Sequence, residues 1–182
     1  MEPIRELIAV DLEMTGLQVK TDRILEIGAV RLADGQLRDT FQTFVNPHRR
    51  IDARITELTG IRPEMVENAP EAEEALRKFL EFAGEAPFLG HNVIFDYSFL
   101  KQCAVNHKIS LERSALDTLK IARKVLKEPE KKSLEALCGY FQIDREHAHR
   151  AVDDAKATAE LFLMLQQKYQ QQEPGLFVPK PL

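Results

Sequence analysis

A buried strand that runs straight into two acidic residues constrains this chain more than any other stretch. The apolar run Leu7-Ile8-Ala9-Val10 leads into Asp11-Leu12-Glu13. An unbroken apolar run is typical of a strand buried on both faces, as in the middle of a helix-covered sheet. Because side chains alternate along a strand, Asp11 and Glu13 point to the same side, roughly 6–7 Å apart along the backbone. Two such carboxylates repel each other unless a cation, a shared proton or water separates them. The stretch therefore predicts a central strand that ends either in a cation site or in solvated acids.

Length, composition and cysteine content favour one domain with a sizeable core. The chain has 182 residues, of which 44% are hydrophobic. Its two cysteines, Cys103 and Cys138, lie far apart in apolar stretches and fit no metal-ligand spacing. We expect them to be core thiols in a reducing environment. The N-terminus lacks a basic flank and no apolar run reaches transmembrane length, so we expect a cytoplasmic protein that does not span a membrane.

The charge distribution limits how the chain could bind nucleic acid. The net charge of −4 argues against a broadly basic binding surface, but it allows one nucleic-acid end to be held in a metal-filled cleft. A basic stretch runs from Arg123-Lys124 to Lys131-Lys132. It either follows the backbone of a bound strand or is a solvated helix and loop, and the second explanation is the ordinary one for such charges.

The order of expected elements is that of an α/β domain. Residues 7–12, 24–32 and 37–45 are expected to form three sequential antiparallel strands, because each is apolar or alternating and is bounded by turn residues. Helices separated by short strands follow. The expected helices are 55–60, 72–83, 94–104, 119–122, 134–138 and 150–170, and the expected short strands are 87–91 and 115–117. Residues 171–182 are rich in proline and glutamine and are expected to be a tail or linker after a domain of residues 1–170.

A third acidic residue lies where an acid is unfavourable without a partner. Asp96 is in the first turn of its expected helix, on the apolar stripe with Phe99 and Leu100. A carboxylate on such a stripe is costly unless it is paired or bound to a metal. The alternative is an acid stabilised by the positive end of the helix dipole. Asn92, just before this helix, is a candidate binding residue or simply a cap.

Helix phase separates two adjacent acids near the end of the chain. Asp154 shares a stripe of small residues with Ala151 and Ala155, whereas Asp153 lies on a mostly solvated side. Asp154 is therefore the candidate ligand, and Asp153 is expected to be a surface acid. His149 lies five residues before Asp154, about 140° round an ideal helix, so the two side chains converge only if His149 is in the loop before the first turn. His147 is expected to be a solvent-exposed histidine.

Four carboxylates and one histidine from separate segments suit metal-dependent hydrolysis. Carboxylates without clustered Cys or His favour hard cations such as Mg²⁺ or Mn²⁺. Two such ions, ~3.5–4 Å apart, are the usual apparatus for in-line attack of water on a phosphodiester. A neutral histidine is a suitable general base for that water. The candidate set is Asp11, Glu13, Asp96, His149 and Asp154.

Three motifs in order resemble a known family. They are Asp11-x-Glu13-x-Thr15-Gly16, then Gly90-His91-Asn92-Val93-Ile94-Phe95-Asp96, then His149-x₄-Asp154-Ala155. Together they resemble the DEDDh 3′–5′ exonucleases, among them the proofreading epsilon subunit of bacterial DNA polymerase III and the exonuclease domain of its Gram-positive counterpart. The resemblance covers roughly residues 5 to 168 and extends to the segments 23–30, 58–61 and 116–119.

The resemblance implies a fold and a division of roles. The fold is ribonuclease H-like, a mixed five-stranded sheet flanked by helices. Asp11, Glu13 and Asp154 are expected to hold a first Mg²⁺ or Mn²⁺ ion. Asp11 is expected to bridge to a second ion, which Asp96 supports partly through water. His149 is expected to activate the attacking water.

The resemblance also implies where a terminal nucleotide lies and what the substrate is. Met14, Thr15 and Leu17 are expected to line that nucleotide, with Asn92 and Phe95 nearby as further nucleotide-binding residues. Thr59 departs from the family, because relatives often carry a histidine there. The implied substrate is the 3′ end of a nucleic acid, with DNA favoured over RNA, and the implied partner is a DNA polymerase subunit in proofreading or repair.

Three alternatives stay open at this point. RNA trimming, as in oligoribonuclease or ribonuclease T, uses the same five residues. A non-catalytic polymerase subunit could retain the fold, although all five positions are intact here. Asp11-Leu12-Glu13-Met14-Thr15 also approximates the nucleophile motif of haloacid dehalogenase-like phosphatases. The Glu in place of the second Asp and the lack of the downstream motifs argue against that class.

Overall fold

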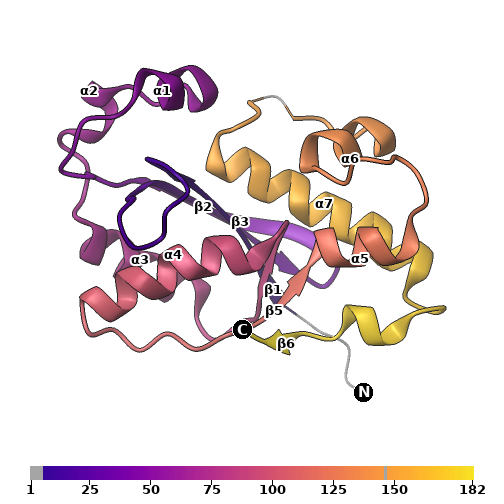
Figure 1. The fold of residues 1–182 in the computed structure, drawn as a ribbon. Helices are drawn as coiled ribbons and strands as arrows, with labels where there is room; N and C mark the ends of the chain where they lie inside the picture. The colour runs from indigo at the N-terminus through magenta and orange to yellow at the C-terminus, as the bar shows by residue number, and fades with distance from the viewer. Residues whose placement is uncertain (1–5, 146) are drawn as a thin grey trace.

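The chain folds around a mixed six-stranded sheet, which Figure 1 shows in a computed structural model describing residues 6–145 and 147–182. The strand order is β3-β2-β1-β4-β5-β6. The pairs β1–β2, β2–β3 and β5–β6 are antiparallel, whereas β1–β4 and β4–β5 are parallel. The strands are β1 (Glu6–Met14), β2 (Ile24–Ala33), β3 (Gln36–Phe44), β4 (Phe88–Gly90), β5 (Ser114–Asp117) and β6 (Lys180–Pro181).

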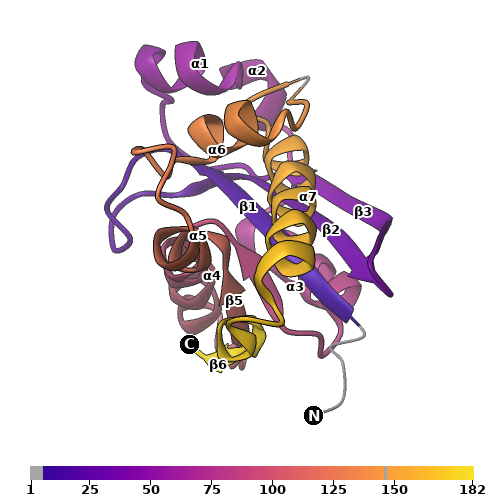
Figure 2. The same cartoon turned by 90° about the vertical axis from the view of Figure 1, so that its right-hand side faces the viewer.

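Helices cover both faces of this sheet (Figures 1 and 2). The longest helix packs across β1 and β2 on one face, and α3 and α4 pack on the other. This arrangement confirms the predicted mixed sheet flanked by helices. The helices are α1 (Ala53–Thr59), α2 (Pro63–Val66), α3 (Ala72–Ala83), α4 (Val93–Asn106), α5 (Thr118–Val125), α6 (Leu134–Phe141), α7 (Ala151–Tyr169) and the 3₁₀ helix η1 (Pro174–Phe177). Within residues 6–145 and 147–182, no helix combines the length and apolar character that crossing a membrane requires.

The alternation of β1 divides the core and aims its acids. Ile8, Val10 and Leu12 belong to the core that also holds residues of α3 and α4, and Leu7 and Ala9 belong to the core under α7. Because successive side chains point to opposite faces, the next two odd-numbered residues of β1 point towards α7. These residues are Asp11 and Glu13.

The end of the chain differs from the expectation. The predicted count of five strands was one too low, because β6 pairs antiparallel with β5. Residues 171–182, expected to be a tail or linker, also contain η1, whose Phe177 is buried against Phe162 of α7 with ring centroids 6.0 Å apart. Polar and proline-rich composition suggested a linker, but one buried aromatic side chain and a short strand hold this segment against the domain.

Gly28 allows α7 to approach β2 more closely than any side chain would permit. A Cβ atom at this position would lie 2.1 Å from the backbone N of Val152 and 2.2 Å from the backbone C of Ala151. Backbone atoms in a packed sheet–helix contact cannot move aside as a flexible side chain can. The glycine therefore sets the distance between β2 and the first turn of α7.

Replacing Gly28 by alanine should destabilise the fold. The added methyl group forces α7 away from β2, and we expect a loss of about 3 kcal/mol in the free energy of unfolding, the upper end of the usual cost of overpacking. Urea denaturation followed by circular dichroism measures this loss. Gly139→Ala in α6 is the control, since a Cβ there meets nothing within 4 Å. Equal stability of the two variants would contradict the close contact.

Candidate active site

The acidic end of β1 forms the floor of the candidate site. Asp11 pairs with Gly28 and Glu13 with Glu26 in the antiparallel register of β1 and β2, and the register shifts directly after Glu13. Both acids lie on the face covered by α7, where the strand leaves the core. Burial, followed by the neighbouring carboxylates of Asp96, Glu13 and Asp154, raises the pKa of Asp11 well above its ordinary value.

Asp96 joins this floor from α4. Its buried carboxylate lies in the first turn of the helix, as predicted, and its Oδ1 accepts a hydrogen bond of 3.1 Å from the backbone N–H of Leu12. Leu12 lies between Asp11 and Glu13, so this bond fixes the start of α4 beside the acidic end of β1. Burial raises the pKa of Asp96 to about 7.

Asp154 and His149 come from the start of α7. Asp154 is only 5% exposed. The side chain of Asp153 is 22% exposed and lies 4.0 Å from Lys156, which agrees with the helix phase read from the sequence. His149 precedes the first turn, with φ 65°, and its backbone N–H donates a hydrogen bond of 3.2 Å to Oδ2 of Asp154. The loop position required for the two residues to converge is therefore present.

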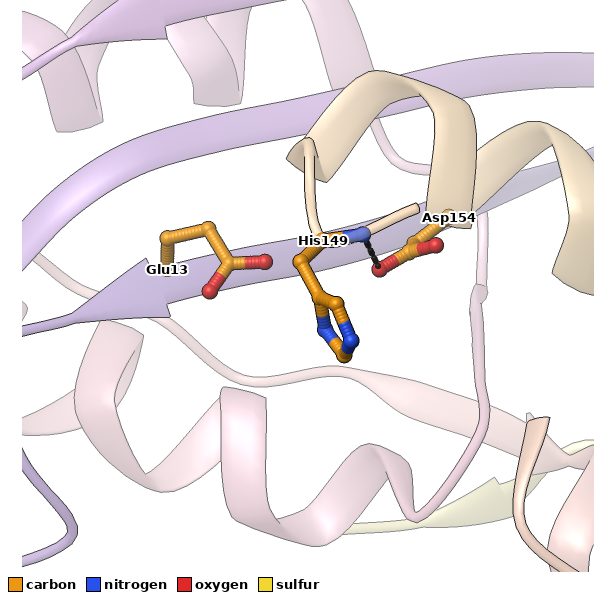
Figure 3. A group of neighbouring side chains, drawn as sticks. All are labelled: Glu13, His149 and Asp154. Carbon is orange, nitrogen blue, oxygen red and sulfur yellow. Dashed lines mark hydrogen bonds between the residues drawn. The ribbon is translucent and has the colours of Figure 1, made fainter. Parts of the chain in front are cut away.

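Glu13, His149 and Asp154 come together in space. One potential ligand atom from each lies within 4.8 Å of the other two, and Figure 3 shows Glu13 reaching from β1 towards the loop and helix that carry the other two. Burial, followed by the charges of Asp154, Glu26 and Asp96, raises the pKa of Glu13 to about 9. The five predicted residues thus meet at one end of β1, although they come from three separate parts of the chain.

The donor set fits a hard divalent cation. Its carboxylate oxygens are the ligands that Mg²⁺ and Mn²⁺ prefer. Asp11, Glu13 and Asp96 form no ion pair within the described part of the chain, and the charge of Arg150, which pairs with Glu26, only partly offsets the rise in the pKa of Glu13. Asp154 alone has a counter-ion, because Arg145 donates to its Oδ1 through Nη2 at 2.6 Å and Nε at 3.1 Å. Sequence analysis did not identify Arg145, which carries no motif signal.

A buried acid that was not predicted from the sequence anchors α7. Glu26 is fully buried, and its carboxylate accepts hydrogen bonds from the backbone N–H of Ala151 at 2.6 Å and from the Arg150 guanidinium at 3.0 and 3.1 Å. These bonds tie the first turn of α7 to β2, next to Glu13. The signal in the sequence was an isolated glutamate inside the apolar stretch 24–32.

A pocket of about 350 Å³ opens beside Glu13. Three candidate nucleotide-binding residues, Met14, Thr15 and Leu17, line it. Helix α1 supplies further lining from Ile55 and Leu58, which were not among the candidates from the sequence. The chain between β1 and β2 is well ordered by its own bonds. The Thr15 hydroxyl donates to Asp22 at 3.0 Å and accepts from the backbone N–H of Arg23 at 2.9 Å. The backbone N–H of Thr15 also donates to the carbonyl oxygen of Arg23 at 2.8 Å, so both its hydroxyl and its N–H are engaged within this segment.

The other two candidate nucleotide-binding residues belong to the start of α4. Asn92 and Phe95 are not among the residues that line this pocket; they lie at the start of α4, next to Asp96. Asn92 is the N-cap residue in a left-handed conformation, and the Phe95 ring packs edge-on against Phe99 with centroids 5.4 Å apart. Thr59, the buried last residue of α1, also lines the pocket. Its hydroxyl donates to the carbonyl of Ile55 at 2.8 Å and accepts from the backbone N–H of Ile61, just after the helix, at 3.1 Å.

A mixed sheet flanked by helices, with acids gathered at one end of its central strand, defines an α/β domain of the ribonuclease H-like class. Comparison of folds agrees. The chain superposes on exonuclease X in complex with 5′ overhanging duplex DNA with a TM-score of 0.76 at 24% identity, covering 94% of this chain and 99% of that one. The nuclease domain of 3′hExo, a DEDDh family member bound to rAMP, gives a TM-score of 0.79 at 20% identity, covering 91% and 94%. At sequence identities this low, the structural similarity establishes the fold alone.

The chain belongs to the RNase_T exonuclease family, whose model matches residues 8–162. It is 45% identical to a DNA polymerase III PolC-type protein of Caldanaerobacter subterraneus subsp. tengcongensis over 91% of this chain and 12% of that protein. It is 37% identical to the Bacillus subtilis protein of the same name over 87% of this chain and 11% of that protein. The chain thus spans only a small part of these relatives. The family assignment overturns the phosphatase alternative.

The crowded acids predict how stability depends on pH. In EDTA, we expect the melting temperature to fall as the pH rises from about 5 to 9. Glu13 and Asp96 have raised pKa values in the folded state, about 9 and about 7, so the folded protein holds more protons than the unfolded chain across this range. Differential scanning calorimetry at fixed ionic strength measures the slope. Glu13→Gln, which cannot ionise, should flatten it, and a melting temperature that rises with pH would show that the acids are not crowded.

Proposed function

We propose that this chain is a metal-dependent 3′–5′ exonuclease that removes nucleotides from the 3′ end of single-stranded DNA as nucleoside 5′-monophosphates. The observation that carries the proposal is the convergence of four carboxylates and one histidine at the end of β1. Membership of an exonuclease family supports the same chemistry. Relatives named as DNA polymerase III support DNA as the substrate, proofreading or repair as the role, and a DNA polymerase as the partner.

The proposed cofactors are two Mg²⁺ or Mn²⁺ ions. Asp11, Glu13 and Asp154 would hold one, and Asp11 and Asp96 would hold the other. When bound, such ions neutralise charge on the phosphate and favour in-line attack by water. The observed crowding of buried carboxylates supports this assignment, because these raised pKa values fall when a cation offsets the repulsion.

The protein's own groups have separate tasks in this proposal. His149, in the loop before α7, accepts a proton from the attacking water, and its backbone N–H keeps Asp154 oriented. Met14, Leu17 and Leu58 provide the apolar lining for the terminal nucleoside in the pocket next to Glu13. This pocket holds one end of a strand, which favours attack at the terminal phosphodiester.

The decisive experiment compares 3′-labelled and 5′-labelled single-stranded DNA and RNA with Mg²⁺ or with EDTA. We expect immediate release of the 3′ label as a mononucleotide, stepwise shortening of the 5′-labelled strand, faster turnover of DNA, and no turnover in EDTA. Faster turnover of RNA would favour the RNA-trimming alternative. Early release of a 5′-terminal mononucleotide, or full activity in EDTA, would refute the proposal.

Two adjacent acids provide a matched control for this assay. We expect Asp154→Ala to abolish turnover and Asp153→Ala to retain most of it, because only Asp154 is buried within the acidic cluster. Circular dichroism verifies that both variants fold. Equal losses of kcat in two folded variants would show that the register assigned to α7 is wrong.

Removal of the histidine ring should affect proton transfer rather than metal binding. We expect His149→Ala to lower kcat by ~10²–10⁴-fold, the usual contribution of a positioned general base. Affinity for Mn²⁺, measured by isothermal titration calorimetry, should change little because the carboxylates remain. The pH–rate profiles of the wild type and the variant at saturating Mn²⁺ should differ, because only the wild type has a side-chain base for the attacking water. A variant that regains wild-type kcat with more metal would show that His149 is a ligand instead.

A further inference from the structure

The exposed face of α5 and of the residue pair after it carries only positive charge. Its four exposed cations recur at steps of three or four residues, and among the described residues none of them forms an ion pair. The opposite side of the helix packs into the core through Ile121 and Ala122. We call this surface the cationic face, and its members are Lys120, Arg123, Lys124 and Lys127.

The cations of α5 differ from those of α3, which are paired with acids. In α3, Arg77 pairs with Glu73 at 2.8 Å and Lys78 pairs with Glu74 at 2.6 Å, each one turn away. No acid occupies the corresponding positions in α5, which spans Thr118–Val125. In a chain whose net charge is −4, the cationic face is therefore a local concentration of positive charge, and the first acids after it in the chain are Glu128 and Glu130.

The cationic face begins where the acidic site begins. Oδ1 of Asp117 accepts hydrogen bonds of 2.9 Å from the backbone N–H groups of both Asn92 and Leu119, so one carboxylate joins the first turns of α4 and α5. The first turn of α4 also carries Asp96. From this shared point the two helices run in opposite directions (Figure 1).

The loop after α5 is held against the same point. The His91 ring bonds through Nδ1 to the Thr118 hydroxyl at 2.8 Å and through Nε2 to the backbone carbonyl of Lys132 at 2.7 Å. A pocket of about 490 Å³ lies here, and it is lined by Arg123 and Lys132 together with His91, Leu119, Glu130 and Ser133. These partly buried hydrogen bonds therefore fix the positions of the cationic face and this pocket relative to the acidic site.

We propose that the cationic face binds the phosphate backbone of the nucleic-acid strand whose 3′ end lies at the acidic site. This inference rests on the proposed function. The eight residues of α5 span about 12 Å, the length of about three phosphates of one strand in B-form DNA. Lysine and arginine are the side chains that neutralise phosphates without reading sequence. An acidic protein segment would also suit the charge, but continuity with the site of the strand's end favours nucleic acid.

The test removes three charges from the face and three from elsewhere. The patch variant is Lys120→Gln/Arg123→Gln/Lys124→Gln. The control variant, Arg38→Gln/Lys168→Gln/Lys180→Gln, removes the same charge from exposed residues of β3, α7 and β6. Fluorescence anisotropy with a fluorescent ten-nucleotide single-stranded DNA, in EDTA over a series of NaCl concentrations, measures binding without turnover.

We expect the patch variant to bind at least tenfold more weakly at low salt than both the wild type and the control variant. The slope of log affinity against log salt should decrease by about two, because each lost single-strand phosphate contact contributes about 0.7. Equal weakening in both variants, or an unchanged slope, would overturn the inference. Loss of binding to polyglutamate with DNA binding intact would also overturn it and assign the face to an acidic protein.

The binding test of the cationic face and the hydrolysis test of the proposed function can fail independently. Hydrolysis of the labelled strands in Mg²⁺ tests the function, and patch-dependent binding in EDTA tests the cationic face. Hydrolysis with no effect of the patch variant on binding refutes only the cationic face. Patch-dependent binding without hydrolysis by the wild type refutes the proposed function, and the inference that depends on it is withdrawn with it.

Discussion

The close packing of α7 on the central strands is the constraint on which the rest of the structure depends. Gly28 lets the helix backbone approach β2 so closely that no side chain fits between them. At the same place, Glu26 accepts hydrogen bonds from the start of α7, including both from Arg150. A fully buried carboxylate is costly unless it is paired and hydrogen-bonded, so Glu26 and the helix stabilise each other only in this position. The contact thereby sets where Asp154 and the His149 loop stand relative to the acidic end of β1.

Local periodicity was enough to predict the central strand and the helix phase, but not the contacts between distant segments. The apolar run before Asp11 and the step of two to Glu13 predicted a buried strand with two acids on one face. The step of one between Asp153 and Asp154 predicted that only the second is buried. The bond between Glu26 and Arg150, by contrast, joins residues 124 positions apart and leaves no periodic trace in the sequence. The sixth strand was missed for the same reason, because its pairing with β5 is a long-range contact within a stretch of linker-like composition.

The position of Arg145 shows how a crowded acidic site keeps its shape. Both oxygens of Asp154 are engaged, Oδ1 by the Arg145 guanidinium and Oδ2 by the backbone N–H of His149. Asp11 and Glu13 have no ion-pair partner within the described part of the chain, and burial, followed by the neighbouring carboxylates, raises the pKa of both. In the proposed function, a metal cation at Asp154 must therefore compete with the Arg145 guanidinium for Oδ1. At Asp11 and Glu13 it displaces no ion-pair partner. Asp154 of α7 is therefore held in position before a cation binds. Asp11 and Glu13 of β1 supply most of the electrostatic attraction for that cation.

The acidic site and the cationic face act on a bound strand with opposite charges. Before cations bind, ionised carboxylates at the acidic site repel a phosphodiester strand. A unit charge about 10 Å away in water contributes only about 0.4 kcal/mol, so distant cations cannot offset that repulsion. Attraction has to act on phosphates upstream of the strand's end, close to the cations and farther from the acids. Asp117 fixes this separation, because its Oδ1 holds the first turns of both α4 and α5. Its Oδ2 is buried without a hydrogen-bond partner among the described residues, and after burial itself its charge also raises the pKa of Asp96. The carboxylate that spaces the two charged regions thus adds to the negative charge of the acidic site, which strengthens the attraction of that site for cations.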